Sequence, residues 1–570
     1  MKMKKRKQPV FSKNVISGFF GDGIVSTIKE KFPEQTKPAM IRNLKRNWYF
    51  PISAMAFFCL SADNTAGYFL GIPIAVVCMI FMSMQVKSFQ EYAAADPVGK
   101  KIMCALSTVG TVLGSQQHFV GEILKLAQSD TFNQVFWLIS LVGAVVSLPI
   151  IYIALSFFWK CFSEVLGNLK LFHDIRNYEK VIYAALLLGS VLLVIFSFSQ
   201  SNAFYGTVQD FDIIYTSDSS YLVKGNVYLA LAHTENDLRQ PLFALFAAPF
   251  LGLPHLAGEL FGETVQVILV NCVQLVMLFA ANFILAKMMN LAPAKRVCFM
   301  LLTSCTYTQL LFTLMMEQYI VAYFWLILCV YLIANRQYFH KIALWGAGGT
   351  LLTSMVMLPF MSSENPVRNT RAWLADVIKL GLEFVLLLLV CCRFDVIFNA
   401  LFLISSYGGF SGEKVLFADK LYQYIAFISS CFIAPDAGVV ATADYVSWQL
   451  RAVNSINCTG VILMVLAVIS AIWNRDQKSS LLATGWAVFS AVILLGLGWG
   501  THENGLILYA LYFGWAFLVL LYQLVEKIER KLNFTFLLPV LTVVTAAIML
   551  VVNIPAIIEM VDFAIAYYPI

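Results

Sequence analysis

The chain has 570 residues, of which 60% are hydrophobic and only 13% are charged, and its mean hydropathy is +0.76. A soluble domain carries about a quarter charged residues, so this composition excludes an ordinary soluble protein and indicates a polytopic all-α membrane protein. The formal net charge of +6 does not predict a nucleic-acid partner, because much of the basic excess lies before residue 47.

The N-terminal segment, residues 1–47, contains the basic stretches KMKKRK and NLKRN. It lacks the short apolar core and the small-residue cleavage site of a signal peptide. Basic residues next to a first membrane helix favour the cytoplasmic side and are attracted to anionic lipid. We therefore expect a retained basic cytoplasmic tail.

Residues 48–179 are predicted to form an N-terminal membrane module of about four helices. Lysines and arginines flank the module on both sides, which places both of its ends in the cytoplasm. No chemistry is expected from it, since its spans carry few polar residues. The predicted spans are Trp48–Leu60, Tyr68–Met84, Ile102–Leu113 and Phe136–Trp159.

An apolar run, Val181–Phe198, then leads into a loop rich in acids. Cytoplasmic loops tend to collect Lys and Arg, so this loop is expected on the outer face. Two following segments, Ser220–Ala232 and Pro241–Leu253, are predicted to lie flat at the interface as amphipathic helices. The ionisable residues of the loop are Asp210, Asp212, Asp218, Lys224, Glu235, Asp237 and Arg239.

The remaining apolar runs bring the total to about fifteen predicted spans. Glu317 is expected at an outer turn between two of them. Tyr407–Asn454 is expected as a long external loop, in which Ile425–Ile433 dips toward the membrane. The predicted spans are Val265–Ala286, Val297–Met315, Tyr319–Ala334, Leu344–Met361, Val377–Cys392, Val396–Ser406, Val461–Trp473, Leu481–Trp499, Leu506–Val525 and Leu537–Val552.

This topology brings polar residues from distant parts of the chain to the outer face. Asp210 and Asp212 alternate across Phe211, so in extended backbone both carboxylates point the same way. One of them could act as a general base, the pair could hold a divalent cation, or the loop could simply be solvated. Asp218 could bind substrate or cap the helix that follows it.

Three further positions are candidates for substrate binding. Arg239 could grip a phosphate with its planar guanidinium, or extend to lipid headgroups. Glu317 could bind substrate or stabilise the start of a helix. His502 and Glu503 follow the run GLGWG, whose glycines predict an unwound helix end, and His502 could bind phosphate or act as an acid or base. Glu413, Asp436 and Arg451 are expected on the same face, and Tyr215, Tyr221, Tyr422 and Trp448 could stack on sugars.

The arrangement resembles the GT-C superfamily of integral-membrane glycosyltransferases. The similarity is carried by Asp210-Phe211-Asp212 after a membrane helix, by the juxtamembrane segments DSSYLVKGNVYLALA and RQPLFALFAAPF, and by Glu317-Gln318-Tyr319 in a later turn. It covers residues 180–570, the predicted glycosyltransferase module with external juxtamembrane helices. The WWD signature of oligosaccharyltransferases is absent, and residues 1–179 match no pattern of this superfamily.

The resemblance implies a polyprenyl-phosphate sugar donor and a hydroxyl acceptor on a cell-envelope or lipid-linked glycan. It implies inverting transfer on the extracytoplasmic face of the plasma membrane, in a bacterial cell, with Asp212 or Asp210 as base. The predicted cofactor is at most a divalent cation, Mg²⁺, Mn²⁺ or Ca²⁺, held by the same two residues. Membrane lipids are the other expected partners. The alternatives are a transporter or flippase of lipid-linked sugars, for which Glu383 lies mid-segment, and a non-catalytic assembly protein.

Overall fold

The structure, a computed structural model, divides the chain into two compact units, which are described separately. Unit 1 comprises Met1–Lys170, Leu229–Pro249 and Arg336–Asn399, and unit 2 comprises Leu171–Tyr228, Phe250–Asn335 and Ala400–Ile570. Most described residues are helical. The structure describes residues 37–61, 69, 72–85, 87–89, 98–102, 104–106, 108, 130–168, 171–208, 211–215, 217, 219, 239–337, 341–390, 411–412, 414–441, 445–501 and 505–570.

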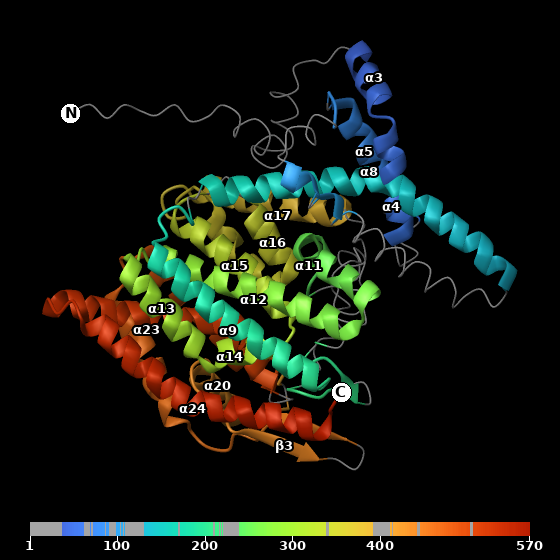
Figure 1. Ribbon diagram of the computed structural model, residues 1–570. Coiled ribbons are helices and arrows are strands. Elements are labelled where there is room, and N and C mark those ends of the chain that lie inside the picture. Colours follow the sequence, from blue (N-terminus) through green and yellow to red (C-terminus); the bar gives the residue numbers. More distant parts are fainter. Residues whose placement is uncertain are drawn as a thin grey trace. The chain divides into compact units, whose positions relative to one another are not determined.

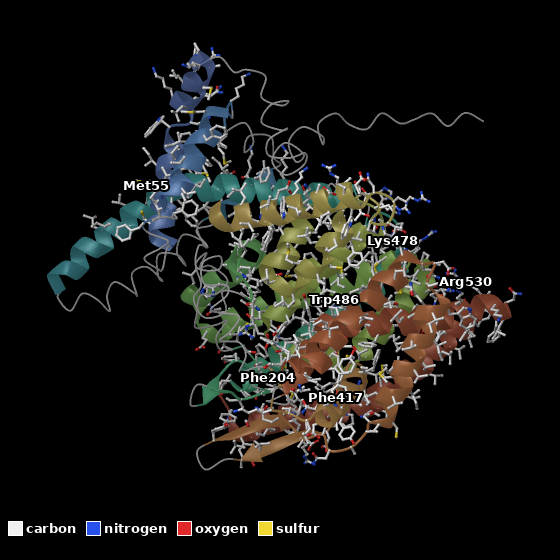
Figure 2. All side chains as sticks on the ribbon, turned by 180° about the vertical axis from the view of Figure 1, so that it is seen from behind. Met55, Phe204, Phe417, Lys478, Trp486 and Arg530 are labelled. Carbon is white, nitrogen blue, oxygen red and sulfur yellow. The ribbon has the colours of Figure 1, made fainter. Side chains whose placement is uncertain are left out.

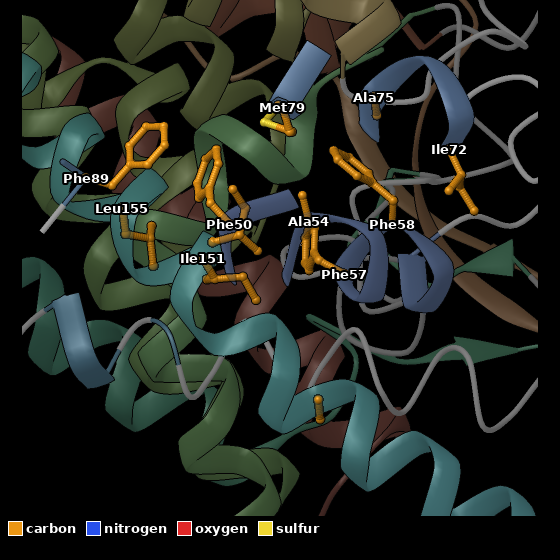
Figure 3. Packing of buried hydrophobic residues seen from close by; sticks show 12 residues of the cluster. Phe50, Ala54, Phe57, Phe58, Ile72, Ala75, Met79, Phe89, Ile151 and Leu155 are labelled. Carbon is orange, nitrogen blue, oxygen red and sulfur yellow. The ribbon is translucent and has the colours of Figure 1, made fainter. Parts of the chain in front are cut away.

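Unit 1 contains the helices of the predicted N-terminal module. α4 (Tyr49–Ser61) and α5 (Ile72–Gln85) match the first two predicted spans, and α8 (Asp130–Asn168) contains the fourth, Phe136–Trp159, and is longer than it. Most of the third predicted span, Ile102–Leu113, lies outside the described residues. α3 (Lys37–Arg46) precedes them. Their buried side chains form one apolar cluster, shown in Figure 3: Phe50, Ala54, Phe57, Phe58, Ile72, Ala75, Met79, Phe89, Ala144, Ile150, Ile151 and Leu155.

A proline explains how α8 packs on α4. Pro149 lies inside α8 and interrupts its hydrogen-bond ladder, since proline has no N–H and its ring clashes with the preceding turn. The next amide, of Ile150, donates to the hydroxyl of Ser53 on α4 at 3.0 Å. The polar contact therefore joins the two helices within their apolar interface.

The predicted span Leu344–Met361 is broken in unit 1. The chain forms α16 (Ile342–Thr350), an extended residue at Leu351, and the 3₁₀ helix η2 (Leu352–Met361). The amide of Leu352 donates to the carbonyl of Arg239 at 2.7 Å, and the amide of Leu242 donates to the carbonyl of Gly349 at 2.8 Å. The backbone groups of Gly349 and Leu352 at the break therefore have hydrogen-bond partners in residues 239–242. α17 (Thr370–Val390) follows and contacts η2.

The segment Pro241–Leu253 differs from its predicted place at the interface. It begins α11 (Phe243–Phe261), whose residues divide between the two units. Most of residues 241–253 are buried, whereas an amphipathic helix lying flat at the interface would have one exposed polar face. The other predicted interfacial segment, Ser220–Ala232, lies outside the described residues.

Unit 2 is a helical bundle in which α12 contacts α9 and α15, α13 contacts α24, and α23 contacts α21 and α22 (Figure 1). Two short antiparallel hairpins, β1–β2 and β3–β4, lie at one end of it. The helices are α9 (Asn177–Gln200), α12 (Glu263–Met288), α13 (Pro293–Cys305), α14 (Tyr307–Leu314), α15 (Gln318–Ala334), α20 (Phe417–Ser430), α21 (Cys458–Trp473), α22 (Lys478–Ser490), η4 (Ala491–Gly496), η6 (Gly505–Tyr509), α23 (Ala510–Leu532) and α24 (Leu537–Tyr567).

Within the described residues, 6 helices are long and apolar enough to cross a membrane. The pair α13 and α14, bent by 63°, could add a seventh span. This is fewer than the sequence predicts, because several predicted runs form helices shorter than a full span and others lie outside the described residues. The 6 are Leu141–Gly167, Asn177–Gln200, Glu263–Met288, Lys478–Gly496, Leu506–Leu532 and Leu537–Tyr567.

The bend between α13 and α14 replaces the predicted straight span Val297–Met315. Thr306 adopts an extended conformation there, and its side chain accepts from the amide of Gln309, which starts α14. The buried amide of Asn553, on α24, donates to the carbonyls of Cys305 and Phe432 at 2.8 Å each. A side chain from another helix therefore satisfies the backbone that the bend exposes.

At one end of unit 2, here called the basic end, a cluster of charged side chains connects α9, α12 and α13. Arg296, at the start of α13, donates to both carboxylate oxygens of Glu179 at 2.9 Å and to Asp174 at 3.1 Å. Lys287, at the end of α12, also binds Asp174, and its hydrogen bond lowers the pKa of that carboxyl. The loops that the sequence assigns to the cytoplasm thus meet in space.

The opposite end, here called the hairpin end, joins α9 to the last residues of the chain. The hydroxyl of Ser201 lies within hydrogen-bond distance of the carbonyls of Ala564 and Tyr568, and Ser201 forms a bridge with Pro569. The hydroxyl of Tyr568 donates to the carbonyl of Val446, in hairpin β3 (Ala437–Ala441) and β4 (Val446–Leu450). Figure 2 shows Lys478 and Arg530 toward the basic end, and Phe204 and Phe417 toward the hairpin end.

The buried ion pair at the basic end gives a stability prediction. Arg296→Met leaves the carboxylate of Glu179, which is 0% exposed, buried without its guanidinium partner. We expect a loss of about 3–5 kcal/mol in the free energy of unfolding, measured by thermal unfolding in detergent micelles. The matched control is Asp174→Asn, because the Asp174 side chain is 54% exposed and should contribute less than about 1 kcal/mol. Equal losses in the two variants would contradict this account.

Candidate functional site

The acid-bearing loop begins with a short hairpin directly after α9. Thr207–Val208 forms β1 and Phe211–Asp212 forms β2, with Asp212 paired to Thr207. The backbone at Asp212 is therefore extended. Asp210 and Asp218 lie outside the described residues, and Asp212 is described by its backbone.

This loop is tied to hairpin β3–β4 by backbone pairing. The amide of Tyr215 donates to the carbonyl of Trp448, and the amide of Trp448 donates to the carbonyl of Ile213, both at 2.9 Å. Trp448 also donates its indole N–H to the hydroxyl of Tyr215, which lies 2.7 Å from that of Tyr307. Burial raises the pKa of Tyr215 to about 12, so the hydroxyl stays neutral. Ile213 and Tyr215, which follow Asp212, are therefore joined to the hairpin by hydrogen bonds.

Tyr215 and Trp448 do not serve as the sugar-stacking surface that the sequence suggested. Their exposed fractions are 2% and 3%, because they pack on each other's segments and on α24, where the Trp448 ring lies 5.5 Å from that of Phe563. Tyr215 has a positive φ of 54°, which costs a non-glycine residue energy. The hydrogen bonds at its amide and hydroxyl hold it in this conformation.

A pocket of about 450 Å³ opens at the hairpin end, between α20, the base of hairpin β3–β4 and the segment leading to α21. One face of α20 lines it with positions spaced as helix neighbours, Gln423, Ala426, Phe427 and Ser430. The other lining residues are Ser429, Ala434, Pro435, Asp436, Leu450, Arg451, Ala452, Val453, Asn454, Ser455, Ile456, Asn457, Cys458, Thr459, Leu506 and Ile507.

The charged groups of the pocket are Asp436 and Arg451, at the base of the hairpin. Their backbones pair, with the amide of Arg451 donating to the carbonyl of Asp436 at 3.0 Å. Their side chains lie 3.4 Å apart and are 73% and 65% exposed, so the ion pair contributes little and the guanidinium can exchange it for another anion. Gly438 permits this position, because a Cβ there would lie 3.1 Å from the guanidinium.

The uncharged groups of the pocket suit a ligand with many hydroxyls. Ser429, Ser430 and Asn457 offer side chains that donate and accept hydrogen bonds. Gln423 donates its amide N–H to the carbonyl of Thr501 at 3.2 Å. Its Oε1 is buried and has no hydrogen-bond partner within the described part of the chain.

The glycine run before His502 forms the unwound end that the sequence predicts. Gly498 and Gly500 have φ values of +68° and +76°, a region that favours glycine. The aliphatic stem of Lys420 lies over Gly498 and Gly412, where a Cβ would come within 2.7 Å and 2.9 Å of its Cε. His502 and Glu503 follow directly and lie outside the described residues.

Glu317 lies in a different environment from the predicted outer turn. It precedes α15, is 0% exposed, and lies beside the middle of α12. The side chain of Gln274 holds its backbone at both ends, donating to its carbonyl at 2.9 Å and accepting from its amide at 3.3 Å. Two residues on, Tyr319 packs edge-on against Tyr509 at the end of η6, with ring centroids 5.6 Å apart. Glu317 is therefore buried, but the helix that follows it starts next to η6, which also lines the pocket.

Arg239 belongs to unit 1, where its backbone carbonyl accepts from the amide of Leu352 and the residue is half-buried. Its binding role stays a prediction.

Among the residues that line the pocket, sequence reasoning missed Gln423 and Ser430, because Tyr407–Asn454 was interpreted as a loop. The signal was the spacing of polar and apolar residues in FADKLYQYIAFISS, which is that of an amphipathic helix.

The predicted cation site cannot be assembled from the described residues. No three His, Cys, Asp or Glu residues come together within them. Asp212 and Asp210 remain the predicted ligands, and Asp210 lies outside the described part. Comparison of the chain with protein-family models, with curated proteins and with solved structures found no match.

The glycine turn predicts how a substitution at Gly498 changes the stability of the protein. Gly498→Ala places a Cβ in a left-handed conformation and against Lys420, and we expect a loss of about 1–2 kcal/mol in the free energy of unfolding. Gly485→Ala is the matched control, because a Cβ at this position of α22 would meet nothing within 4 Å and alanine favours a helix. Thermal unfolding should rank the control above wild type and Gly498→Ala below it; the reverse order would refute the turn's role.

Proposed function

We propose that this protein is a membrane glycosyltransferase of the GT-C type that acts at the hairpin end of unit 2. The substrates would be a polyprenyl-phosphate sugar and a hydroxyl of a cell-envelope or lipid-linked glycan. The proposal joins the resemblance of the sequence to that superfamily with the presence of several helices that could span a membrane. The hairpin end would face the extracytoplasmic side of the plasma membrane, since the basic loops gather at the opposite end.

The observation that carries the proposal is the connection between the acid loop and the pocket. Ile213 and Tyr215, which follow β2, pair with Trp448 in hairpin β3–β4. The same hairpin supplies Asp436, Leu450 and Arg451 to the pocket. A strand that carries a candidate base and a pocket that carries a guanidinium are therefore held in one structure.

The proposed chemistry uses groups that this end of the protein offers. The carboxylate of Asp212 or Asp210 takes the proton of the acceptor hydroxyl, whose oxygen then forms a bond to the anomeric carbon of the donor. The bond from that carbon to the phosphate oxygen breaks, and polyprenyl phosphate leaves with inversion at the sugar. A divalent cation held by the two acids would stabilise charge on the leaving phosphate.

Cationic groups are needed to bind the phosphate, and Arg451 is the described candidate in the pocket. Its planar fork can contact two phosphate oxygens at once. His502 remains a candidate for the same task, and Glu503 and Asp218 for contacts to the sugars. The hydroxyl and amide groups of the pocket match the many hydroxyls of a glycan.

The base is tested by removing its charge and keeping its shape. Asp212→Asn and Asp210→Asn are assayed in membranes with a panel of labelled polyprenyl-phosphate sugars and glycan acceptors. We expect the variant that lacks the base to lose transfer by at least about 10²-fold, because a positioned base contributes about 10²–10⁴ in rate.

Asp174→Asn is the matched control, since it removes an exposed carboxylate at the basic end and should retain full transfer. Expression and thermal stability are compared across all variants. Transfer near the wild-type rate in both single variants and in the double variant would refute a catalytic role for this loop.

A transporter of lipid-linked sugars is the second candidate, and a buried ion pair in unit 1 favours it. Lys341 and Glu383 lie 2.9 Å apart and are 8% and 6% exposed. α16 and α17 are not among the 6 helices that are long and apolar enough to span a membrane, so the pair supports transport only as a buried ionic contact between two helices of unit 1. Lys341 sits at the start of α16 and Glu383 within α17, so their separation would move these two helices.

Transport is tested in proteoliposomes with a fluorescent polyprenyl-phosphate sugar, quenched from one side. For a transporter we expect wild-type protein and Asp212→Asn to move the lipid between leaflets, and Glu383→Gln to slow this movement at least about tenfold. If wild-type protein moves no labelled lipid under conditions in which it transfers sugar, the transporter candidate fails.

A further inference from the structure

The basic end of unit 2 carries a surface that combines cations with exposed apolar side chains. It is formed by the end of α21, the turn after it, the last turn of α23 and the loop to α24. We call it the Trp473 surface, and its members are Trp473, Arg475, Lys527, Arg530, Lys531, Leu532, Phe534 and Phe536.

Two lysines share one aromatic ring in this surface. The ammonium groups of Lys531 and Lys527 lie 5.3 Å and 5.9 Å from the centre of the Trp473 ring. Lys527 also donates to the carbonyl of Trp473. The ring face and the carbonyl attract the cations. Both ammonium groups carry a positive charge that an anion could balance.

The carboxylates of α23 neutralise only Arg530 among the cations of this surface. Glu529 binds Lys295 with one oxygen and the amide of Leu538 with the other, and it is 4% exposed. Glu526 is 7% exposed and binds Arg530 and Lys295. The exposed side chains of Arg475 and Lys531 therefore leave an excess of positive charge at the surface, against one exposed acid in the turn, Asp476.

The apolar part of the surface is held in place. α23 ends at Leu532 and is followed by Asn533, which has a positive φ of 53°, and the amide of Phe534 donates to the carbonyl of Glu529 at 3.2 Å. With the side chain of Glu529 bound to Leu538, the loop is fixed at both of its ends. Phe534 and Phe536 are nevertheless 52% and 68% exposed. The loop joins two helices that could span a membrane, so these rings lie at the level where a bilayer would end.

We propose that the Trp473 surface is a binding site for an anionic phospholipid. The headgroup phosphate binds between Lys527 and Lys531, and the acyl chains lie against Leu532, Phe534 and Phe536. Basic groups beside a membrane attract anionic lipid, and aromatic rings anchor at the interface. A soluble phosphate would match the cations but leave the apolar side chains in water, so the surface as a whole fits a lipid.

The test uses the full chain in detergent and in nanodiscs of phosphatidylcholine, with or without phosphatidylglycerol. Native mass spectrometry measures lipid binding, and thermal unfolding measures the shift that the lipid causes. For Lys527→Gln combined with Lys531→Gln we expect the apparent affinity for phosphatidylglycerol to fall about tenfold or more, and the upward thermal shift to be largely lost.

Arg368→Gln combined with Arg371→Gln is the matched control, because it removes the same charge from exposed positions of unit 1 and should bind phosphatidylglycerol like wild type. Equal affinity in both double variants, or no preference of the wild type for phosphatidylglycerol over phosphatidylcholine, would overturn the proposal. So would an equal thermal shift with inorganic phosphate alone. None of these measurements depends on glycosyl transfer.

Discussion

An amide or carbonyl group that leaves a helix inside an apolar bundle must find another partner, because neither lipid nor apolar side chains can replace it. This constraint decides how the interior of unit 2 is assembled. The bend at Thr306 exposes backbone that Asn553 satisfies from α24, and the same amide reaches the carbonyl of Phe432, next to α20. One side chain thus fixes three elements relative to one another, and α20 in turn forms a wall of the pocket.

The two ends of unit 2 differ in how their polar groups are used. At the basic end the carboxylates of Glu179 and Glu529 are bound to cations and buried, so their role is to hold helices together. At the hairpin end Asp436 and Arg451 form a loose exposed pair beside a pocket. A buried, tightly paired charge holds helices together, whereas an exposed, weakly paired charge can exchange its partner for a charged group of a ligand. This contrast is the physical reason to seek the chemistry at the hairpin end.

The apolar runs of the sequence predicted most helices, since a long apolar segment has few alternatives. The predicted sides of the loops are consistent with Asp174, Lys287 and Arg296 meeting at one end. The sequence did not predict where two of these helices are interrupted. Leu344–Met361 and Val297–Met315 look unbroken because the partners that permit a break, the carbonyl of Arg239 and the amide of Asn553, lie far away in sequence.

Conversely, Asn553 and Pro555 made α24 appear to end at Val552, although the helix continues to Tyr567 with the proline inside it. For the candidate site, the unwound helix end before His502 could be predicted from local sequence, because its glycines favour such a break. The pocket could not, because it depends on α20 and β3–β4 packing against residues that follow them.

The closure of α9 on the last helix has a consequence for biosynthesis. Ser201 is made long before Ala564 and Tyr568, the carbonyls next to its hydroxyl, and Cys305 is made long before Asn553. Until α24 is synthesised, the hydroxyl of Ser201 and the carbonyl of Cys305 therefore lack these partners. The contacts that close the hairpin end of unit 2 can form only after this helix is present.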